Sequence, residues 1–234
     1  MIRLWPGLSG KALFPIEAIR SALVFLLCLG ACATAHQSIY PSSSYAVASW
    51  YGPKFQGRPT SSGETFDMYK KTCAHREYAF GTKLRVTNPA NGKTVECVVN
   101  DRGPFVEGRD LDLSYAAAKE IALIGPGTGR VLIERESRDS SYIRTVEVQT
   151  GELAGPLAIQ VGSFTDGLNA IRLKEALNLR YANVYIQEAE IEGTGYYRVR
   201  VGNFEAAGEA LEVAQRLGQE GYQPFVIKAD QENR

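Results

Sequence analysis

The chain has 234 residues, and its 26 basic and 26 acidic side chains give a formal net charge of zero. This length is enough for one large or two small domains. The balance of charge gives no indication of a nucleic-acid partner, and no long run of one charge indicates an electrostatic tail. We therefore expect a neutral or mildly charged partner.

The N-terminal segment has the pattern of a secretion signal. Arg3, Lys11 and Arg20 precede an apolar run over residues 21–30. At about 1.5 Å per residue the run covers roughly 15 Å, half of the ~30 Å hydrocarbon core, so a permanent transmembrane helix is the weaker interpretation. The run ends in Leu29-Gly30-Ala31-Cys32, which resembles a bacterial lipobox.

The lipobox resemblance implies that residues 1–31 are a lipoprotein signal peptide and that Cys32 is acylated as the first residue of the mature protein. Several acyl chains anchor a protein firmly where one chain would not. Ala33 after the cysteine resembles lipoproteins sorted to the outer membrane, so we expect a protein anchored there and facing the periplasm. Ordinary cleavage at Ala33-Thr34-Ala35 remains the alternative.

Residues 32–44 are polar and Ser-rich, which suits a tether. From 45 to 136, short runs of β-branched and aromatic residues alternate with Gly, Pro and Asn turns, as in an all-β domain. Asn91-Gly92 predicts a hairpin turn, and Ser114 is the N-cap of a helix that reaches about residue 123. The predicted strands lie at 45–51, 83–87, 94–100 and 130–134.

Two further cysteines, Cys73 and Cys97, remain after removal of the signal. An even pair in an oxidising compartment favours a disulfide, and two buried thiols that act as small apolar residues are the alternative. One nearby histidine and two distant cysteines match no usual ligand spacing, so we expect no metal site.

Asp101 is the first candidate for a catalytic group. It ends an apolar run over residues 95–99 and precedes a Gly-Pro turn, so a strand fixes it and the turn exposes it. The alternative is an aspartate that caps this turn or pairs with Arg102 or Arg109, and such pairing would lower its pKa.

A dense polar block upstream of Asp101 contains Glu64, Asp67 and His75. Either carboxylate could tune an acid by repulsion or hold a sugar hydroxyl, and the imidazole can both donate and accept a hydrogen bond. Surface loop carboxylates and a structural histidine are the alternatives.

The C-terminal part contains an internal repeat. Residues 137–154 are expected to be a linker with some strand character, because Val146-Glu147-Val148-Gln149 alternates. Beyond it Val161-Gly162-Ser163-Phe164 recurs as Val201-Gly202-Asn203-Phe204. Apolar residues at helical spacing follow each copy. With a second strand in each half, residues 155–230 predict a β-α-β-β-α-β domain with an antiparallel sheet and helices on one face. The expected core positions are Ala170, Leu173, Leu177, Ala210, Val213, Ala214 and Leu217.

The first domain resembles the rare lipoprotein A family over residues 48–123. The match rests on Ala48-Ser49-Trp50-Tyr51-Gly52, Thr60-Ser61-Ser62-Gly63-Glu64, Phe66-Asp67, Thr72-Cys73-Ala74-His75, Asn100-Asp101-Arg102-Gly103-Pro104-Phe105 and Asp112-Leu113-Ser114. This resemblance implies a six-stranded double-psi β-barrel and a lytic transglycosylase, or a silent relative, that acts on peptidoglycan at the division septum.

The implied chemistry needs one carboxylic acid that protonates the glycosidic oxygen and then, as a carboxylate, takes a proton from the C6 hydroxyl of the sugar. Asp101 is assigned this role, with Glu64, Asp67 and His75 around it. Aromatic faces can pack on sugar rings, although most strand aromatics are core. The candidate glycan contacts of the barrel are Trp50, Tyr51, Arg102 and Phe105.

Residues 157–227 resemble the SPOR domain of cell-division proteins, through Ile159-Gln160-Val161-Gly162-Ser163-Phe164 and Tyr197-Arg198-Val199-Arg200-Val201. Such domains bind glycan stripped of its peptides, and the resemblance assigns hydrogen bonds and a stacking surface to Gln160, Ser163, Tyr197, Arg198 and Arg200. In an alternating strand the two arginines share one face while Tyr197 lies on the other, so not all of them can touch ligand.

Together the two domains predict an endolytic transglycosylase that cleaves peptide-free strands between N-acetylmuramic acid and N-acetylglucosamine and leaves 1,6-anhydro ends. We expect no cofactor. The expected partners are the glycan strands, the membrane that holds the lipid anchor, and cell-division proteins at the septum. The alternative is a catalytically inactive septal glycan-binding lipoprotein, because one fold hosts active and silent members.

Overall fold

The computed structural model describes residues 42–149 and 155–229. The expected signal peptide, the acylation site at Cys32 and nearly all of the expected tether lie outside these residues. Within the described ranges, no helix has the length and apolar character needed to cross a membrane.

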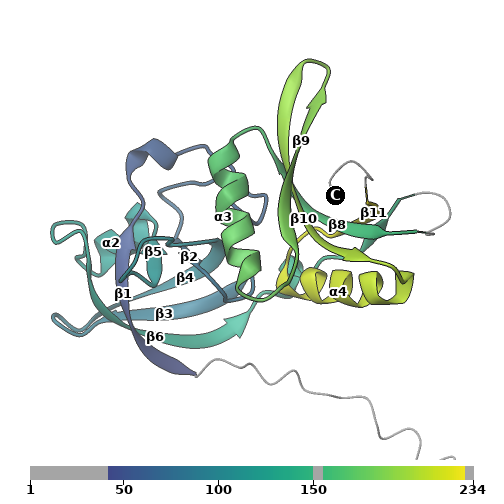
Figure 1. Ribbon diagram of the computed structural model, residues 1–234. Helices are drawn as coiled ribbons and strands as arrows, with labels where there is room; N and C mark the ends of the chain where they lie inside the picture. Colours follow the sequence, from purple (N-terminus) through teal and green to yellow (C-terminus); the bar gives the residue numbers. More distant parts are fainter. Residues whose placement is uncertain (1–41, 150–154, 230–234) are drawn as a thin grey trace, which may run out of the picture. The chain divides into compact units, whose positions relative to one another are not determined.

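The N-terminal domain is a closed barrel of six strands, which confirms the expected architecture (Figure 1). Around the barrel the order is β1-β5-β2-β4-β3-β6. The pairs β1–β5 and β2–β4 are parallel and the other neighbours are antiparallel. The strands are β1 (Ser43–Trp50), β2 (Thr72–His75), β3 (Thr82–Asn88), β4 (Lys93–Asp101), β5 (Leu111–Leu113) and β6 (Gly129–Arg138).

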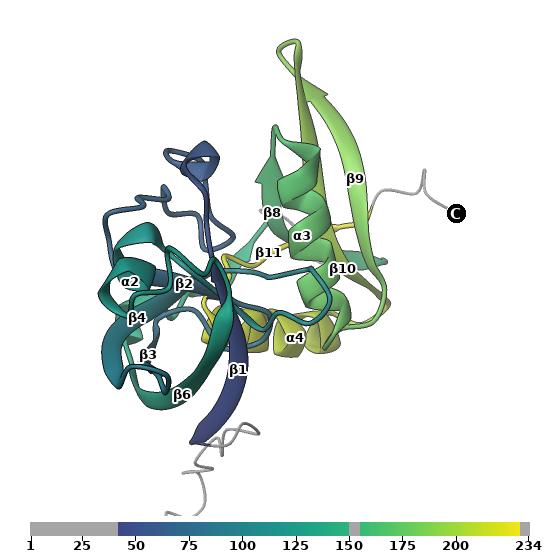
Figure 2. The same ribbon diagram turned by 90° about the vertical axis from the view of Figure 1, so that its left-hand side faces the viewer.

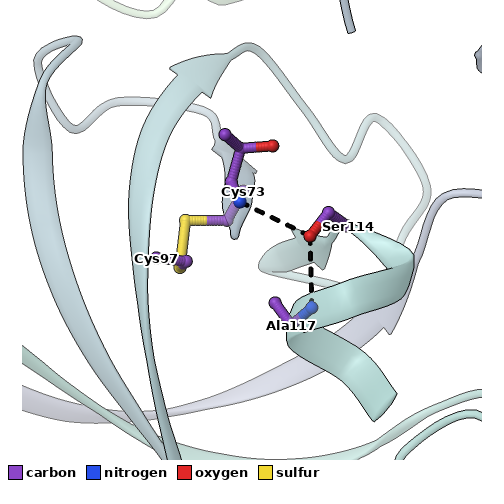
Figure 3. The surroundings of a disulfide bond; sticks show 5 residues. Cys73, Cys97, Ser114 and Ala117 are labelled. Carbon is purple, nitrogen blue, oxygen red and sulfur yellow. Dashed lines mark hydrogen bonds between the residues drawn. A yellow bond between two sulfur atoms is a disulfide. The ribbon is translucent and has the colours of Figure 1, made fainter. Parts of the chain in front are cut away.

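Four barrel strands coincide with runs predicted from alternation, and Asn91-Gly92 joins β3 to β4 as expected. The two others, β2 and β5, have four and three residues and are too short to show a period. Helix α2 (Tyr115–Glu120) begins after Ser114, whose hydroxyl accepts a hydrogen bond from the Ala117 N–H at 3.2 Å (Figure 3). It ends earlier than predicted, and Ala122 just beyond it has a φ of 56°.

The C-terminal domain is a five-stranded sheet with the order β7-β11-β8-β10-β9. Its strands are β7 (Glu147–Val148), β8 (Leu157–Phe164), β9 (Val184–Ile191), β10 (Thr194–Phe204) and β11 (Phe225–Lys228). Each of the last four is antiparallel to its neighbours among them, and they form the predicted β-α-β-β-α-β unit with α3 (Gly167–Asn178) and α4 (Ala207–Glu220).

Both helices pack on the sheet, α3 on β8, β9 and β10, and α4 on β8, β10 and β11 (Figure 2). Their contact faces are the ones that the repeat predicts. All seven expected core positions are buried, namely Ala170, Leu173, Leu177, Ala210, Val213, Ala214 and Leu217.

The segment expected to be a linker with some strand character, residues 137–154, is structured in its described part. It contains the end of β6, a short 3-10 helix η2 (Ser140–Tyr142) and strand β7, which runs parallel to β11. The Asp139 N–H donates to the Gly81 carbonyl at 2.9 Å, and the Arg144 N–H donates to the Gly218 carbonyl at 3.0 Å. Backbone hydrogen bonds therefore join this segment to both domains.

The expected disulfide is present and joins the neighbouring strands β2 and β4 (Figure 3). The Cα atoms of Cys73 and Cys97 are 5.9 Å apart, and both side chains are 1% exposed. His75 follows two residues after the first cysteine and Asp101 four residues after the second. The bond therefore ties together the strands that end in these two site residues.

Replacing both cysteines by alanine should lower the free energy of unfolding by about 3 kcal/mol, because the bond closes a loop with a sequence separation of 24. Urea unfolding of the purified variant measures this change. Reduction of the native protein should produce a similar loss. A change below about 1 kcal/mol in both experiments would mean that strand pairing alone restricts the loop.

Candidate functional site

The carboxylate of Asp101, at the end of β4, is fixed by three hydrogen bonds. Its Oδ1 accepts from the backbone N–H groups of Ser61 and Arg102, both at 2.8 Å, and its Oδ2 accepts from the Tyr51 hydroxyl at 3.0 Å. Arg109 instead pairs with Asp112 at 3.4 Å. The side chain of Asp101 is thus bonded both to the backbone of the next residue, Arg102, and to the loop that contains Ser61.

Glu64 lies in the same cluster. Its Oε1 accepts a hydrogen bond from the Tyr142 hydroxyl, and its Oε2 accepts one from Asn100 Nδ2, both at 2.6 Å. A tight turn returns the chain here, because the Thr60 N–H donates to the Glu64 carbonyl at 2.8 Å. The Ser62 N–H donates to the Asn100 carbonyl at 3.3 Å. The loop over residues 60–64 is therefore bonded to the last two residues of β4.

Asp67 is held by its own turn. Its Oδ1 accepts from the Tyr69 N–H at 3.0 Å, and its carbonyl accepts from the Lys70 N–H at 3.1 Å. No hydrogen bond between its side chain and Asp101 or Glu64 is found among the described residues. Its contacts thus fit the alternative interpretation, in which Asp67 is a surface loop carboxylate.

His75 ends β2, the strand that pairs with β4 beside Asp101. Its Nδ1 accepts from the N–H groups of Glu77 and Tyr78, both at 3.1 Å, so the ring proton is on Nε2. Burial, followed by the positive charges of Arg102 and Arg76, lowers the pKa of His75 to about 3. At neutral pH this residue is a neutral donor through Nε2.

Arg102 is not a glycan contact, because its side chain is 3% exposed. Its Nε donates to the Tyr222 hydroxyl at 2.6 Å and its Nη1 donates to the Tyr78 carbonyl at 2.9 Å. The guanidinium carbon lies 3.7 Å from the centre of the Phe80 ring and 5.0 Å from that of Tyr222. The expectation that Arg102 binds sugar is corrected, since protein contacts leave almost none of this residue exposed.

Tyr51 contributes its hydroxyl to the site. Its ring packs against Phe66 and Phe55, with ring centres 5.0 and 5.4 Å away. Burial, together with the negative charges of Asp101 and Asp112, raises the pKa of Tyr51 well above its usual value. The phenol therefore stays protonated and donates to Asp101, which differs from the expected role as an open stacking platform.

The other barrel aromatics differ in exposure. Trp50 is partly buried and meets Tyr115 edge to face at 5.9 Å, and Tyr115 meets the exposed ring of Tyr69 at 6.3 Å. Phe105 is 37% exposed, so its ring can be reached by a ligand.

Four of the candidate residues of the SPOR-like sheet lie opposite one another in pairs. Arg198 pairs with Ser163, and Arg200 pairs with Gln160. A bulge in β8 between these pairs brings Gln160 and Ser163, three positions apart, onto the face shared by the two arginines.

This face points away from α3. A Cβ at Gly162, on the opposite face of the same strand, would lie 2.9 Å from Leu173 of α3. Ser163 is exposed and Arg198 is partly exposed, whereas Arg200 is 3% exposed. The expectation of a ligand contact is therefore corrected for Arg200 and stays a prediction for the other three.

Several members of the cluster carry no signal in the sequence. Ser61 and Asn100 stand inside the motifs of the barrel domain, but a backbone N–H or a side-chain amide matches no sequence pattern of its own. Tyr142 comes from the assumed linker. Asp112 accepts a hydrogen bond from the Ser49 hydroxyl, and burial raises the pKa of this carboxyl.

The lowered pKa of His75 predicts a pH dependence of stability. In the unfolded chain His75 binds a proton below about pH 6.5, whereas in the folded protein it binds one only below about pH 3. The free energy of unfolding should therefore fall as the pH falls from about 6.5 to about 3. The free energy of unfolding should decrease by at most about 1.4 kcal/mol per pH unit from this group.

Urea unfolding between pH 7 and pH 4 measures this slope. The matched control is His75→Asn, in which an amide oxygen can accept the same two N–H groups without titrating. The slope should be smaller in this variant. An identical slope in both proteins would assign the pH dependence to other groups.

Family models match both domains. The lytic transglycolase model matches residues 43–133 and the SPOR domain model matches residues 153–228. The first match covers the six barrel strands except for the end of β6, and the second covers the sheet from β8 to β11 with both helices.

Curated relatives include the endolytic peptidoglycan transglycosylase RlpA of Vibrio cholerae, which is 53% identical over 87 residues, or 37% of this chain and 33% of the relative. RlpA of Campylobacter jejuni is 35% identical over 185 residues, or 72% of this chain and 66% of the relative. The chain thus spans between a third and two thirds of the length of these relatives. The solved SPOR domain of Pseudomonas aeruginosa RlpA is 29% identical and covers 31% of this chain and 99% of that domain, with a TM-score of 0.28.

The Campylobacter alignment is longer than either domain, so it includes residues of both. With one model matching the barrel and another matching the sheet domain, the chain belongs to the rare lipoprotein A family.

Proposed function

We propose that the protein is an endolytic peptidoglycan transglycosylase in which Asp101 is the acid and base of the barrel and the SPOR domain binds peptide-free glycan. The main support is the carboxylate at the end of β4, which three donors fix in a barrel of the lytic transglycolase family. The named relatives are endolytic peptidoglycan transglycosylases.

The reaction needs a group that first gives and then takes a proton. Protonated Asp101 donates to the glycosidic oxygen as the bond to C1 breaks, and the resulting carboxylate takes the proton of the C6 hydroxyl as that oxygen bonds to C1. The product is a 1,6-anhydro end, and no water is consumed.

The two oxygens of Asp101 suit different tasks. Oδ1 accepts two backbone N–H groups, whereas Oδ2 has the Tyr51 hydroxyl as its donor. A protonated carboxyl oxygen keeps a lone pair, so Oδ2 can accept from the Tyr51 hydroxyl in both protonation states while its own proton stays free for the glycosidic oxygen. We assign proton transfer to Oδ2, and we assign the Nε2–H of His75 to a sugar oxygen.

The SPOR domain supplies the substrate. Gln160, Ser163 and Arg198 lie on the sheet face opposite α3, where polar side chains can hydrogen-bond sugar hydroxyls. A second binding site on one chain raises the local concentration of glycan at the barrel. The preference for peptide-free strands and the septal location are part of this proposal.

Asp101→Asn should lower the rate of anhydro-fragment release at least 100-fold, because it removes the transferable proton while leaving an oxygen that can accept from Ser61 and Arg102. The assay incubates purified residues 33–234 with peptide-free glycan and detects the products by mass spectrometry. Glycan pull-down and thermal unfolding should match the parent protein.

Two outcomes would contradict the proposal. A variant that still cleaves would remove Asp101 from its role. A parent protein that binds glycan but releases no anhydro-ended fragment would be the catalytically inactive glycan-binding protein.

The lipid anchor at Cys32 and the outer-membrane location are proposed from the lipobox. Cys32→Ala should move the full chain from the membrane fraction to the soluble periplasmic fraction, because the acyl chains are lost. Immunoblots of fractionated cells measure the change, with Cys28→Ala as the matched control. Membrane retention of the Cys32 variant would argue against acylation at this residue.

A further inference from the structure

We propose that Tyr142 is a positioning residue of the active site, which holds Glu64 and the loop over residues 60–64 in register with Asp101. The inference rests on the proposed function for its kinetic consequence, but its structural part can be tested without catalysis. Tyr142 lies beyond residues 43–133, the range of the lytic transglycolase model.

The contact to Glu64 is short and has a partner on its other side. The Tyr142 hydroxyl donates to Oε1 at 2.6 Å, and Asn100 Nδ2 donates to Oε2 at 2.6 Å. Hydrogen bonds to an ionised acceptor are shorter and stronger than neutral ones. Burial, the hydrogen bond to Glu64 and its charge all raise the pKa of Tyr142, so the phenol keeps the proton that it donates.

The ring of Tyr142 packs against the barrel at Gly81. Gly81 has a φ of 83°, and a Cβ built there would lie 2.7 Å from Cδ2 of Tyr142, so the ring packs directly over this glycine. The Gly81 N–H donates to the Val99 carbonyl at 2.8 Å, two residues before Asp101. The ring therefore rests on the backbone that is bonded to the acid-bearing strand.

The turn that presents Tyr142 is closed locally. Asp139 caps η2 through a hydrogen bond from the Ser141 N–H to Oδ1 at 2.9 Å, and its own N–H donates to the Gly81 carbonyl. Gly81 thus accepts a hydrogen bond from Asp139 at the start of the turn and contacts the ring of Tyr142 at the end of the turn. This arrangement fixes the hydroxyl without using the sheet of the C-terminal domain.

The effect of Tyr142 reaches Asp101 through the loop. Glu64 ends the turn whose Ser61 N–H donates to Asp101 Oδ1, and Ser62 bonds to the Asn100 carbonyl. Removing the hydroxyl frees Oε1 and leaves Asn100 as the donor to this carboxylate. The loop over residues 60–64 then becomes more mobile, and the Ser61 N–H is no longer held in a fixed position against Oδ1 of Asp101.

The test variant is Tyr142→Phe, which keeps the ring on Gly81 and removes only the hydroxyl. The kcat for release of anhydro fragments should fall at least about tenfold, the lower end of the effect expected for one hydrogen bond to a charged group, with KM nearly unchanged. Tyr45→Phe is the matched control, because that side chain is 58% exposed on β1, and it should not change kcat.

A readout independent of catalysis is amide hydrogen exchange. The Ser61 and Ser62 amides should exchange faster in Tyr142→Phe than in the parent protein, while the amides paired between β3 and β4 should not change. In a Glu64→Ala background the same tyrosine substitution should have no further effect on this exchange, because its acceptor is already gone.

The outcomes separate this inference from the proposed function. Unchanged exchange at Ser61 and Ser62 would overturn the positioning role, whatever the activity. Equal acceleration with and without Glu64 would assign Tyr142 to general stability and would also overturn it. If the parent protein releases no anhydro fragments, the proposed function fails while the exchange experiment still decides the role of Tyr142.

Discussion

The site depends on the contacts that satisfy the buried guanidinium group of Arg102. A charge removed from water is tolerated only with hydrogen-bond partners, and here the hydroxyl of Tyr222 and the carbonyl of Tyr78 accept from it while Phe80 covers one face. These contacts fix the side chain in one direction. The backbone N–H of the same residue donates to Asp101, so the requirement to satisfy a buried cation also orders the neighbouring carboxylate.

The same cation explains the state of His75. Its positive charge is the second cause of the lowered pKa of this residue after burial, and two backbone N–H groups at Nδ1 act in the same direction by favouring an unprotonated nitrogen. A histidine beside an acid is often assigned to proton transfer. In this protein the surroundings leave His75 a fixed neutral donor, which is why the proposed mechanism assigns proton transfer to the carboxylate of Asp101.

The sequence predicted what depends on local pattern. Alternation located β1, β3, β4 and β6, helical spacing located the buried faces of α3 and α4, and the end of an apolar run located Asp101. Strands β2 and β5 were too short for a period. Arg102 was misassigned because its partner Tyr222 lies 120 positions away, and Tyr142 gave no signal because a lone tyrosine in a Ser-rich segment matches no pattern.

The segment that follows β6 and connects the two domains is structured, and this bears on how the sheet domain could raise the concentration of glycan at the barrel. A flexible linker raises local concentration by an amount set by its length. Here the Arg144 N–H donates to Gly218, and the Phe80 N–H donates to the Glu220 carbonyl at 2.9 Å, so backbone hydrogen bonds join barrel and sheet domain. The gain in local concentration proposed for the sheet domain therefore does not follow from linker length alone.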